Sequence, residues 1–147
     1  AISAAAIRRI SEFVPQGLSN LAWALARLSL SDPQLLAAIA EQSIAKLDSL
    51  NAQDLSNTLW ALAKLEMAHL PLLNAISSES VRKIGEFNPQ SISNSAWSLA
   101  TFLLADMPLM QVLAAEALRK ISNFNVQSIS NLAWSCAKLQ YKYDQLL

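Results

Sequence analysis

Apolar residues recur in this chain every three or four positions, which is the spacing of an amphipathic helix. Near the N-terminus, Leu18, Ala22 and Leu25 fall on one arc of a helical wheel and predict a buried face. The same arrangement returns three more times, and the pattern Gln-x-x-Ser-Asn-x-x-Trp begins at Gln16, Gln53, Gln90 and Gln127, with a spacing of 37. A fixed period of this length predicts a repeat protein.

Each repeat is predicted to hold two helices, here called helix A and helix B. Helix A follows an N-cap asparagine and, in the second copy, runs from about Gln53 to Leu65. Helix B begins at the column of Asp32, His69 and Asp106 and runs to about Leu47, Ile84 or Ile121. The N-caps of helix A are Asn51, Asn88 and Asn125, Pro15 and Pro89 occupy its first position, and Ser49, Gly85 and Asn123 mark the turn into the next repeat.

These elements predict an all-α fold, a right-handed α-solenoid of stacked helical hairpins. We expect a partial repeat at 1–14, repeats at 15–51, 52–88 and 89–125, and a partial repeat at 126–147. Because the chain starts and stops inside repeats, we expect it to be a stretch of a longer solenoid.

The wheel of helix A separates into a core arc, an arc that is identical in all four copies and an arc that varies. The identical arc forms a ladder of Gln16, Asn20, Trp23, Gln53, Asn57, Trp60, Gln90, Asn94, Trp97, Gln127, Asn131 and Trp134, together with a serine and an alanine in each copy. The varying arc reads Gly17, Leu21, Ala24, then Asp54, Thr58, Ala61, then Ser91, Ser95, Ser98, then Ser128, Leu132, Ser135. Identical positions must meet something that repeats, and varying positions are free to meet something that differs.

Two partners would explain the identical arc. One is the neighbouring helix A, with the tryptophan filling the gap and the amides bonding to the backbone of the next repeat, because buried amides need such partners. The other is a polymer lying along the helices, held by its backbone. A half-buried ladder would satisfy both interpretations.

A sparse column of cations follows the tryptophans. Arg27, Lys64 and Lys138 stand four residues after a tryptophan, where each can lie over the indole ring, and Thr101 interrupts the column. These cations could instead have a structural role, because the aliphatic parts of their side chains would cover the edges of the tryptophan rings.

Helix B carries charges of both signs. Glu79 with Lys83 and Glu116 with Lys120 are i,i+4 pairs in the favourable order. The pattern predicts a solvated outer face.

The amino-acid composition limits the classes of function that this chain can have. The 147 residues are 53% hydrophobic and 15% charged, and eleven basic residues balance eleven acidic ones. This balance argues against strong nonspecific binding of nucleic acid by this segment alone. The single cysteine, Cys136, lies in a leucine column and is expected in the core. No apolar run is long enough for a membrane span, so no membrane insertion is expected.

Chemistry-bearing motifs are missing from the sequence. There is no nucleophile motif, phosphate loop or metal-ligand spacing. The one histidine, His69, shares a column with two aspartates and is expected to cap a helix. We therefore expect no enzyme, no cofactor, no metal and no small-molecule substrate.

The segments Leu55–Leu65 and Phe87–Trp97 resemble the helix A signature of the octotricopeptide and heptatricopeptide repeat families, which are related to FAST-kinase and RAP-domain proteins. The resemblance implies an α-solenoid in an organelle (mitochondrion or plastid) that binds RNA in its maturation, stability or translation, or forms a fixed part of an organellar ribosome.

On this basis the first hypothesis is a protein that binds single-stranded RNA along helix A. Arg27, Lys64 and Lys138 would meet phosphates, and the varying residues Asp54, Thr58, Ser91, Ser95 and Ser128 would meet bases. The alternative is a protein-interaction scaffold within a larger assembly. The ladder resembles the columns with which armadillo repeats hold extended peptides, and it is also similar to repeats of bacterial effectors.

Overall fold

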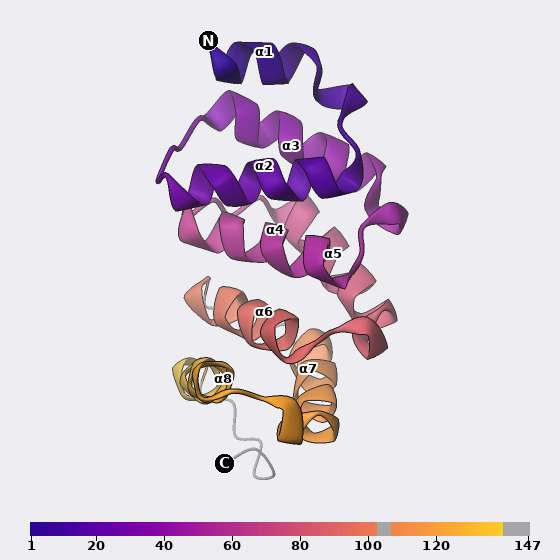
Figure 1. Ribbon diagram of the computed structural model, residues 1–147, viewed down its shortest axis with the longest axis vertical. Helices are drawn as coiled ribbons and strands as arrows, with labels where there is room; N and C mark the ends of the chain where they lie inside the picture. The colour runs from indigo at the N-terminus through magenta and orange to yellow at the C-terminus, as the bar shows by residue number, and fades with distance from the viewer. Residues whose placement is uncertain (103–106, 140–147) are drawn as a thin grey trace.

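The computed structural model describes residues 1–102 and 107–139, and every regular element in these ranges is helical. One row of helices, the A layer, contains α2 (Pro15–Arg27), α4 (Ala52–Lys64), α6 (Pro89–Thr101) and α8 (Val126–Lys138). The other row, the B layer, contains α1 (Ile2–Arg8), α3 (Pro33–Ala45), α5 (Leu70–Arg82) and α7 (Met107–Arg119). The expected all-α stack of helical hairpins is confirmed (Figure 1).

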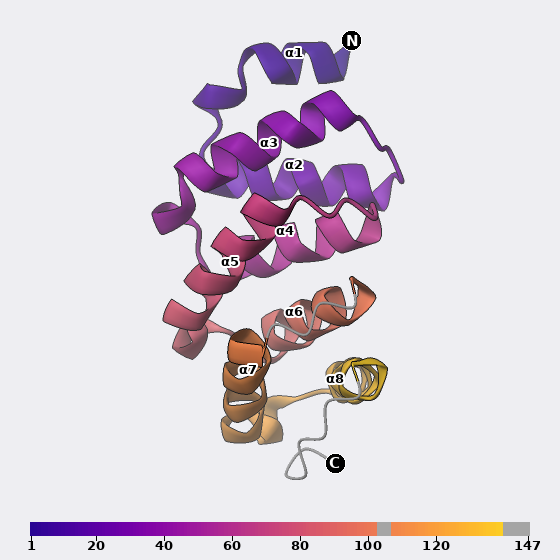
Figure 2. The same ribbon diagram turned by 180° about the vertical axis from the view of Figure 1, so that it is seen from behind.

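Successive A helices lie side by side, and the stack twists along its length. In Figure 1, α2 is seen from the side and α8 is seen along its axis. The reverse view in Figure 2 shows α3, α5 and α7 forming the opposite side of the molecule. The molecule therefore has two long faces, one made by each layer.

Local sequence signals begin the helices as expected. The Asn51 side chain accepts a hydrogen bond from the Asp54 amide at 2.8 Å, and the Asp54 carboxylate accepts one from the Asn51 amide at 3.1 Å. This reciprocal pair is a capping box. Nδ1 of His69 accepts from the Leu72 amide at 3.1 Å, so the expected capping role of this histidine is confirmed. Asp106 lies outside the described residues.

Helix B ends slightly earlier than expected. A short 3-10 helix follows it in each repeat, and the residues predicted to end helix B lie inside these elements. They are η1 (Ile10–Glu12), η2 (Leu47–Ser49), η3 (Ile84–Glu86) and η4 (Ile121–Asn123). The predicted turn residues Ser49, Gly85 and Asn123 also fall within them. The 3-10 helix thus provides the turn between one hairpin and the next.

α2 and α4 each end in a left-handed turn without glycine. Ser29 and Glu66 have φ angles of 53° and 55°, which side-chain-bearing residues seldom adopt. The turn is closed by a hydrogen bond from the Leu30 amide to the Leu25 carbonyl at 2.9 Å and by its equivalent from Met67 to Leu62. This closure satisfies carbonyls that the end of the helix would otherwise leave unpaired.

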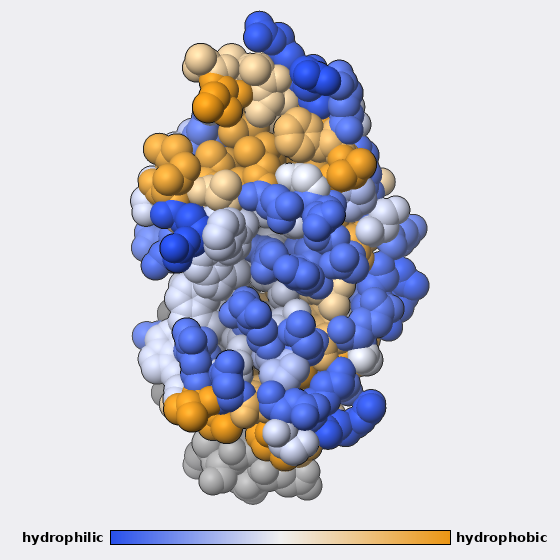
Figure 3. Space-filling model, in the orientation of Figure 1, coloured by the Kyte–Doolittle hydropathy of each residue, from blue (hydrophilic) through white to orange (hydrophobic). Residues whose placement is uncertain are grey.

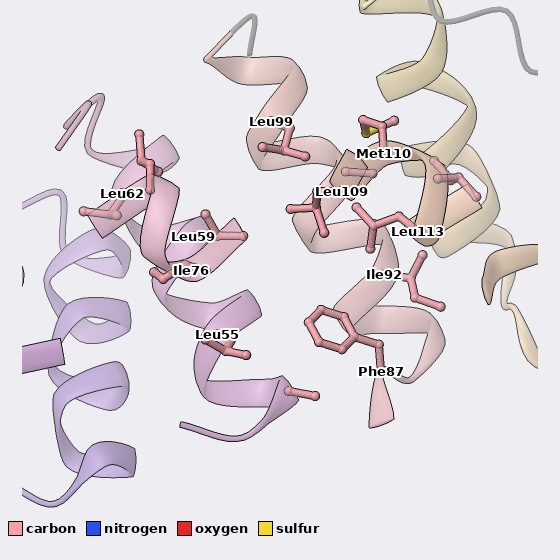
Figure 4. Packing of buried hydrophobic residues seen from close by; sticks show 14 of the residues in the cluster. Leu55, Leu59, Leu62, Ile76, Phe87, Ile92, Leu99, Leu109, Met110 and Leu113 are labelled. Atoms are coloured by element: carbon pink, nitrogen blue, oxygen red, sulfur yellow. The ribbon is translucent and has the colours of Figure 1, made fainter. Parts of the chain in front are cut away.

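The hydrophobic core lies between the two layers. Leu55, Ile76, Phe87 and Leu109 are completely buried, and Figure 4 shows such side chains filling the space between helices of both layers. Cys136 is buried in the same cluster, as its leucine column predicted. Among helices of the described ranges, none has the length and apolarity that crossing a membrane requires.

The B layer is joined by a lysine that repeats at the ends of α3, α5 and α7, whereas Arg9 stands at the end of α1. The ammonium group of this lysine donates to two backbone carbonyls of the preceding repeat. Lys46 binds Ser11 and Phe13, Lys83 binds Asp48 and Leu50, and Lys120 binds Gly85 and Phe87, all at 2.6–3.0 Å. We call this arrangement the lysine clamp.

The clamp changes the interpretation of the charges on helix B. Glu79 pairs with Lys83 at 3.0 Å and Glu116 pairs with Lys120 at 2.7 Å, so the predicted pairs exist. However, the two glutamates are only 5% and 4% exposed, and the prediction of a solvated outer face is wrong for them. The reason is the neighbouring repeat, whose turn packs over the end of the helix and supplies the carbonyls that bind the lysine.

Candidate functional site

The varying arc of helix A lies inside the stack. Its residues that we expected to meet bases are buried, and none is more than 5% exposed: Asp54, Thr58, Ser91, Ser95 and Ser128. The expectation that this arc is exposed is therefore wrong. Asp54 in α4 faces the preceding A helix, because it accepts a 2.9 Å hydrogen bond from Ser19 in α2. Thr58 donates instead to the Asp54 carbonyl of its own helix at 2.7 Å.

The identical arc divides between the stack and the surface. Its serines and alanines are buried in α2, α4 and α6, where they allow neighbouring helices to approach closely. Its glutamines are exposed in all four A helices, and its asparagines are exposed or partly exposed. The ladder is therefore the outward edge of the interface between A helices.

The ladder amides have no partners within residues 1–102 and 107–139. The four glutamine and four asparagine side chains of the ladder make no hydrogen bond to the protein there. The proposed bonding to the backbone of the next repeat is thus not found. A repeated row of amides remains available to a ligand, with a donor and an acceptor on each.

A polar cleft of about 180 Å³ lies between α6 and α8, and polar side chains line it: Gln90, Ser93, Asn94, Asn125, Gln127, Ser128 and Asn131. Ser93 donates to the Gln90 carbonyl at 3.1 Å, and the Asn125 side chain accepts from the Ser128 amide at 2.8 Å. A second polar cleft of about 250 Å³ lies at the beginnings of α4 and α6 and includes Gln53, Asn88 and Ser91. The clefts follow the boundaries between A helices.

The tryptophans flank these amides, one turn further along each helix. Trp23 and Trp134 are 44% and 45% exposed, and Trp60 and Trp97 are partly exposed. The rings of Trp97 and Trp134 stack with centroids 6.4 Å apart and an interplanar angle of 28°. The ladder therefore offers aromatic faces at half-buried, fixed positions.

The cation column lies beside the tryptophans. Arg27, Lys64 and Lys138 are exposed. The guanidinium of Arg27 lies 5.6 Å from the centre of the Trp23 ring, so the predicted contact of cation and indole is confirmed for this pair. At the gap in the column, the Thr101 hydroxyl donates to the Trp97 carbonyl at 2.9 Å.

Figure 3 shows this side of the molecule in the orientation of Figure 1. Hydrophilic residues extend over its middle, where α4 and α6 lie, and hydrophobic residues gather over α1 and α2 at the N-terminal end. Hydrophilic side chains thus predominate over α4 and α6 on this face.

The chemistry of this face suits binding. No group of three or more metal-ligating side chains occurs in the described part of the chain. Burial raises the pKa of the Cys136 thiol, which lies in the core away from the ladder. What the face offers is uncharged hydrogen bonding, aromatic surface and a few cations.

The fold and this face define a class: an α-solenoid repeat protein with a repeating, largely neutral polar surface. Residues 1–145 match the family model of the RNA-editing substrate-binding complex 6 protein, and the chain belongs to this family. No curated protein sequence matches the chain significantly. The family supports the expectation of an RNA-associated helical protein.

Proposed function

We propose that this chain binds single-stranded RNA along the exposed edge of the A layer, as a noncatalytic component of an RNA-editing complex. The family supports the RNA-editing context. The observation that carries the proposal is the ladder of amides, which have no hydrogen-bond partner among the described residues, beside half-exposed tryptophans. The octotricopeptide and heptatricopeptide resemblance and an organellar location belong to the same proposal, and the family favours editing over a ribosomal role.

Bases would bind the ladder and the tryptophans. Amides can form paired hydrogen bonds with the edge of a base, and aromatic faces stack on bases for about 1–3 kcal/mol each. Single-stranded RNA exposes both its base edges and its base faces, whereas a duplex hides them. The buried varying residues take no part in binding the bases.

Phosphates would bind the exposed cations of the A layer. Three such cations, Arg27, Lys64 and Lys138, lie on this face of a chain with no net charge. With three phosphate contacts, log K should fall with log salt at a slope of about −2 on a single strand. Most of the affinity would then come from uncharged contacts.

The test is a titration of labelled single-stranded RNA of random sequence, followed by fluorescence anisotropy between about 50 and about 200 mM salt. Replacing Arg27, Lys64 and Lys138 by alanine should remove most of the salt dependence. The control replaces Arg8, Arg82 and Arg119, three exposed arginines of the B layer, by alanine as well. Because Arg82 and Arg119 pair with Glu79 and Glu116, circular dichroism verifies that this variant remains helical. Equal loss in the two triple variants would reject the A layer as the RNA surface.

A peptide is the second candidate, because the neutral amides of the ladder suit a peptide backbone equally well. Near-zero net charge favours this alternative. The same titration separates the two: absence of RNA binding at low salt would reject the first proposal and leave an extended peptide of a partner protein as the ligand to test.

A further inference from the structure

The polar residues between neighbouring A helices are nearly the same at each junction. Between α6 and α8 the lining consists of two glutamines, three asparagines and two serines. The equivalent positions between α4 and α6 carry the same residue types: Gln53, Ser56, Asn57, Asn88, Gln90, Ser91 and Asn94. Between α2 and α4 they differ by one residue, since Asp54 replaces a serine.

That single difference is hidden from a ligand. Both carboxylate oxygens of Asp54 are occupied, one by the Ser19 hydroxyl at 2.9 Å and the other by the Asn51 amide at 3.1 Å. Asp54 is also 4% exposed. At these seven positions the three junctions therefore offer a ligand equivalent amides, and the cleft at the beginnings of α4 and α6 also includes Glu86.

The three junctions also share the same kinds of hydrogen-bond donors and acceptors. The N-cap asparagines Asn51, Asn88 and Asn125 each use their side-chain oxygen to accept from the helix backbone at 2.8 Å, and their NH₂ groups remain as donors. The ladder amides, which have no protein partner in the described ranges, keep both donor and acceptor. Each junction thus presents neutral donors and acceptors together, a set that suits the edge of a nucleobase better than a phosphate.

A solenoid that recognises a different base at each repeat needs different exposed side chains at each repeat. In this chain the residues that differ between repeats of helix A are mostly buried, and the exposed ladder is constant. The exposed ladder therefore cannot select a different base at each successive repeat.

We infer that the A layer binds a run of a single nucleobase, with one base at each junction between neighbouring A helices. This inference rests on the proposed RNA-binding function. Amides bond adenine, uracil and cytosine through a donor beside an acceptor, so the shared chemistry is such an edge repeated along the strand. A strand of mixed sequence would place an unsuitable edge in at least one junction.

The experiment compares oligo(A), oligo(U) and oligo(C) with an RNA of equal length and mixed sequence in which no base occurs twice in succession. Fluorescence anisotropy should show that one homopolymer binds at least about tenfold more tightly than the mixed strand, which is the discrimination of one good amide–base pair. Equal binding of the mixed strand and the best homopolymer, or tightest binding of the mixed strand, would overturn the inference.

Substitutions in the ladder locate the preference. The triple variant Asn57→Ala, Asn94→Ala and Asn131→Ala should lose the preference for one homopolymer while keeping the salt slope set by the cations. A matched control removes Gln34, Asn74 and Gln111, exposed amides of the B layer, and should keep the preference. Loss in the control as well would reject the ladder as the source of specificity.

These outcomes separate the inference from the function on which it rests. RNA binding with no base preference contradicts the inference and leaves the RNA-binding function standing. If neither the homopolymers nor the mixed strand bind at low salt, both are rejected. Circular dichroism of each variant verifies that it remains helical.

Discussion

The A and B layers are built from the same repeats but use their polar side chains in opposite ways. In the B layer, Lys83 satisfies two carbonyls of the preceding repeat and pairs with the buried Glu79. In the A layer, the side-chain amides of Asn57 and Gln53 lie at the edge of the stack and form no hydrogen bond to the described residues. The lysines of the B layer hold neighbouring repeats together, whereas these amides of the A layer do not.

The difference follows from what covers each side chain. A charged group removed from water must be paired, because an unpaired buried charge costs several kcal/mol. An amide at a surface edge has water as its partner and gains nothing from a fixed contact. The comparison therefore predicts that substitutions in the B layer change stability and substitutions at the edge of the A layer change binding.

The largest effect is expected for Lys83→Ala, which leaves two backbone carbonyls without their donor and leaves Glu79 paired with Arg82 alone. The free energy of unfolding should fall by about 2–3 kcal/mol in urea titrations. Lys46→Ala is the matched comparison, because Gln42 replaces the glutamate in that repeat, and it should cost about 1–3 kcal/mol. Equal losses in the two variants would show that the buried carboxylate is unimportant.

Acid should weaken the B layer next. The side-chain hydrogen bond from Arg82, followed by Lys83, lowers the pKa of Glu79 below its usual value, despite burial. A lowered folded-state pKa stabilises the fold above the unfolded pKa of about 4.3, and this contribution is lost as the pH falls through the folded pKa. Glu79→Gln should flatten the decline of stability with acid in thermal unfolding experiments, and an unchanged pH profile would contradict this role.

The ladder should tolerate change without loss of stability. Asn57→Ala, Asn94→Ala and Asn131→Ala together should leave the melting temperature unchanged or raise it, because alanine is the better helix former by about 0.5 kcal/mol per site. Differential scanning calorimetry measures this directly. A clear decrease would mean that the asparagines hold the repeats together, and the comparison of the two layers would fail.

The smallest effect concerns the end of α4. Glu66 has a φ of 55°, and Glu66→Gly should stabilise the chain by about 1 kcal/mol because glycine adopts this conformation without strain. Glu41→Gly, on an exposed part of α3, should instead destabilise by about 1 kcal/mol. Similar effects of both glycines in urea titrations would argue against strain at Glu66.

The sequence determined the features that depend on neighbours along the chain. The period of 37, the helical caps at Asn51 and His69, and the burial of Cys136 were predictable, because capping and periodicity act over a few residues. The predicted pairing of Glu79 with Lys83 follows from helical spacing alone and is also found.

Only the tertiary structure decided what lies against each arc of a helix. A wheel gives angles, but serine, threonine and alanine suit a tight helix interface as well as a surface, so the burial of Thr58 and Ser95 could not be derived from it. The same applies to Glu79. Its charge alone predicts a solvent-exposed side chain, and only the contacts with the preceding repeat show that it is buried. Burial of these side chains is set by contacts with the neighbouring repeat, about one period away along the chain. The spacing of residues within one helix cannot predict such contacts.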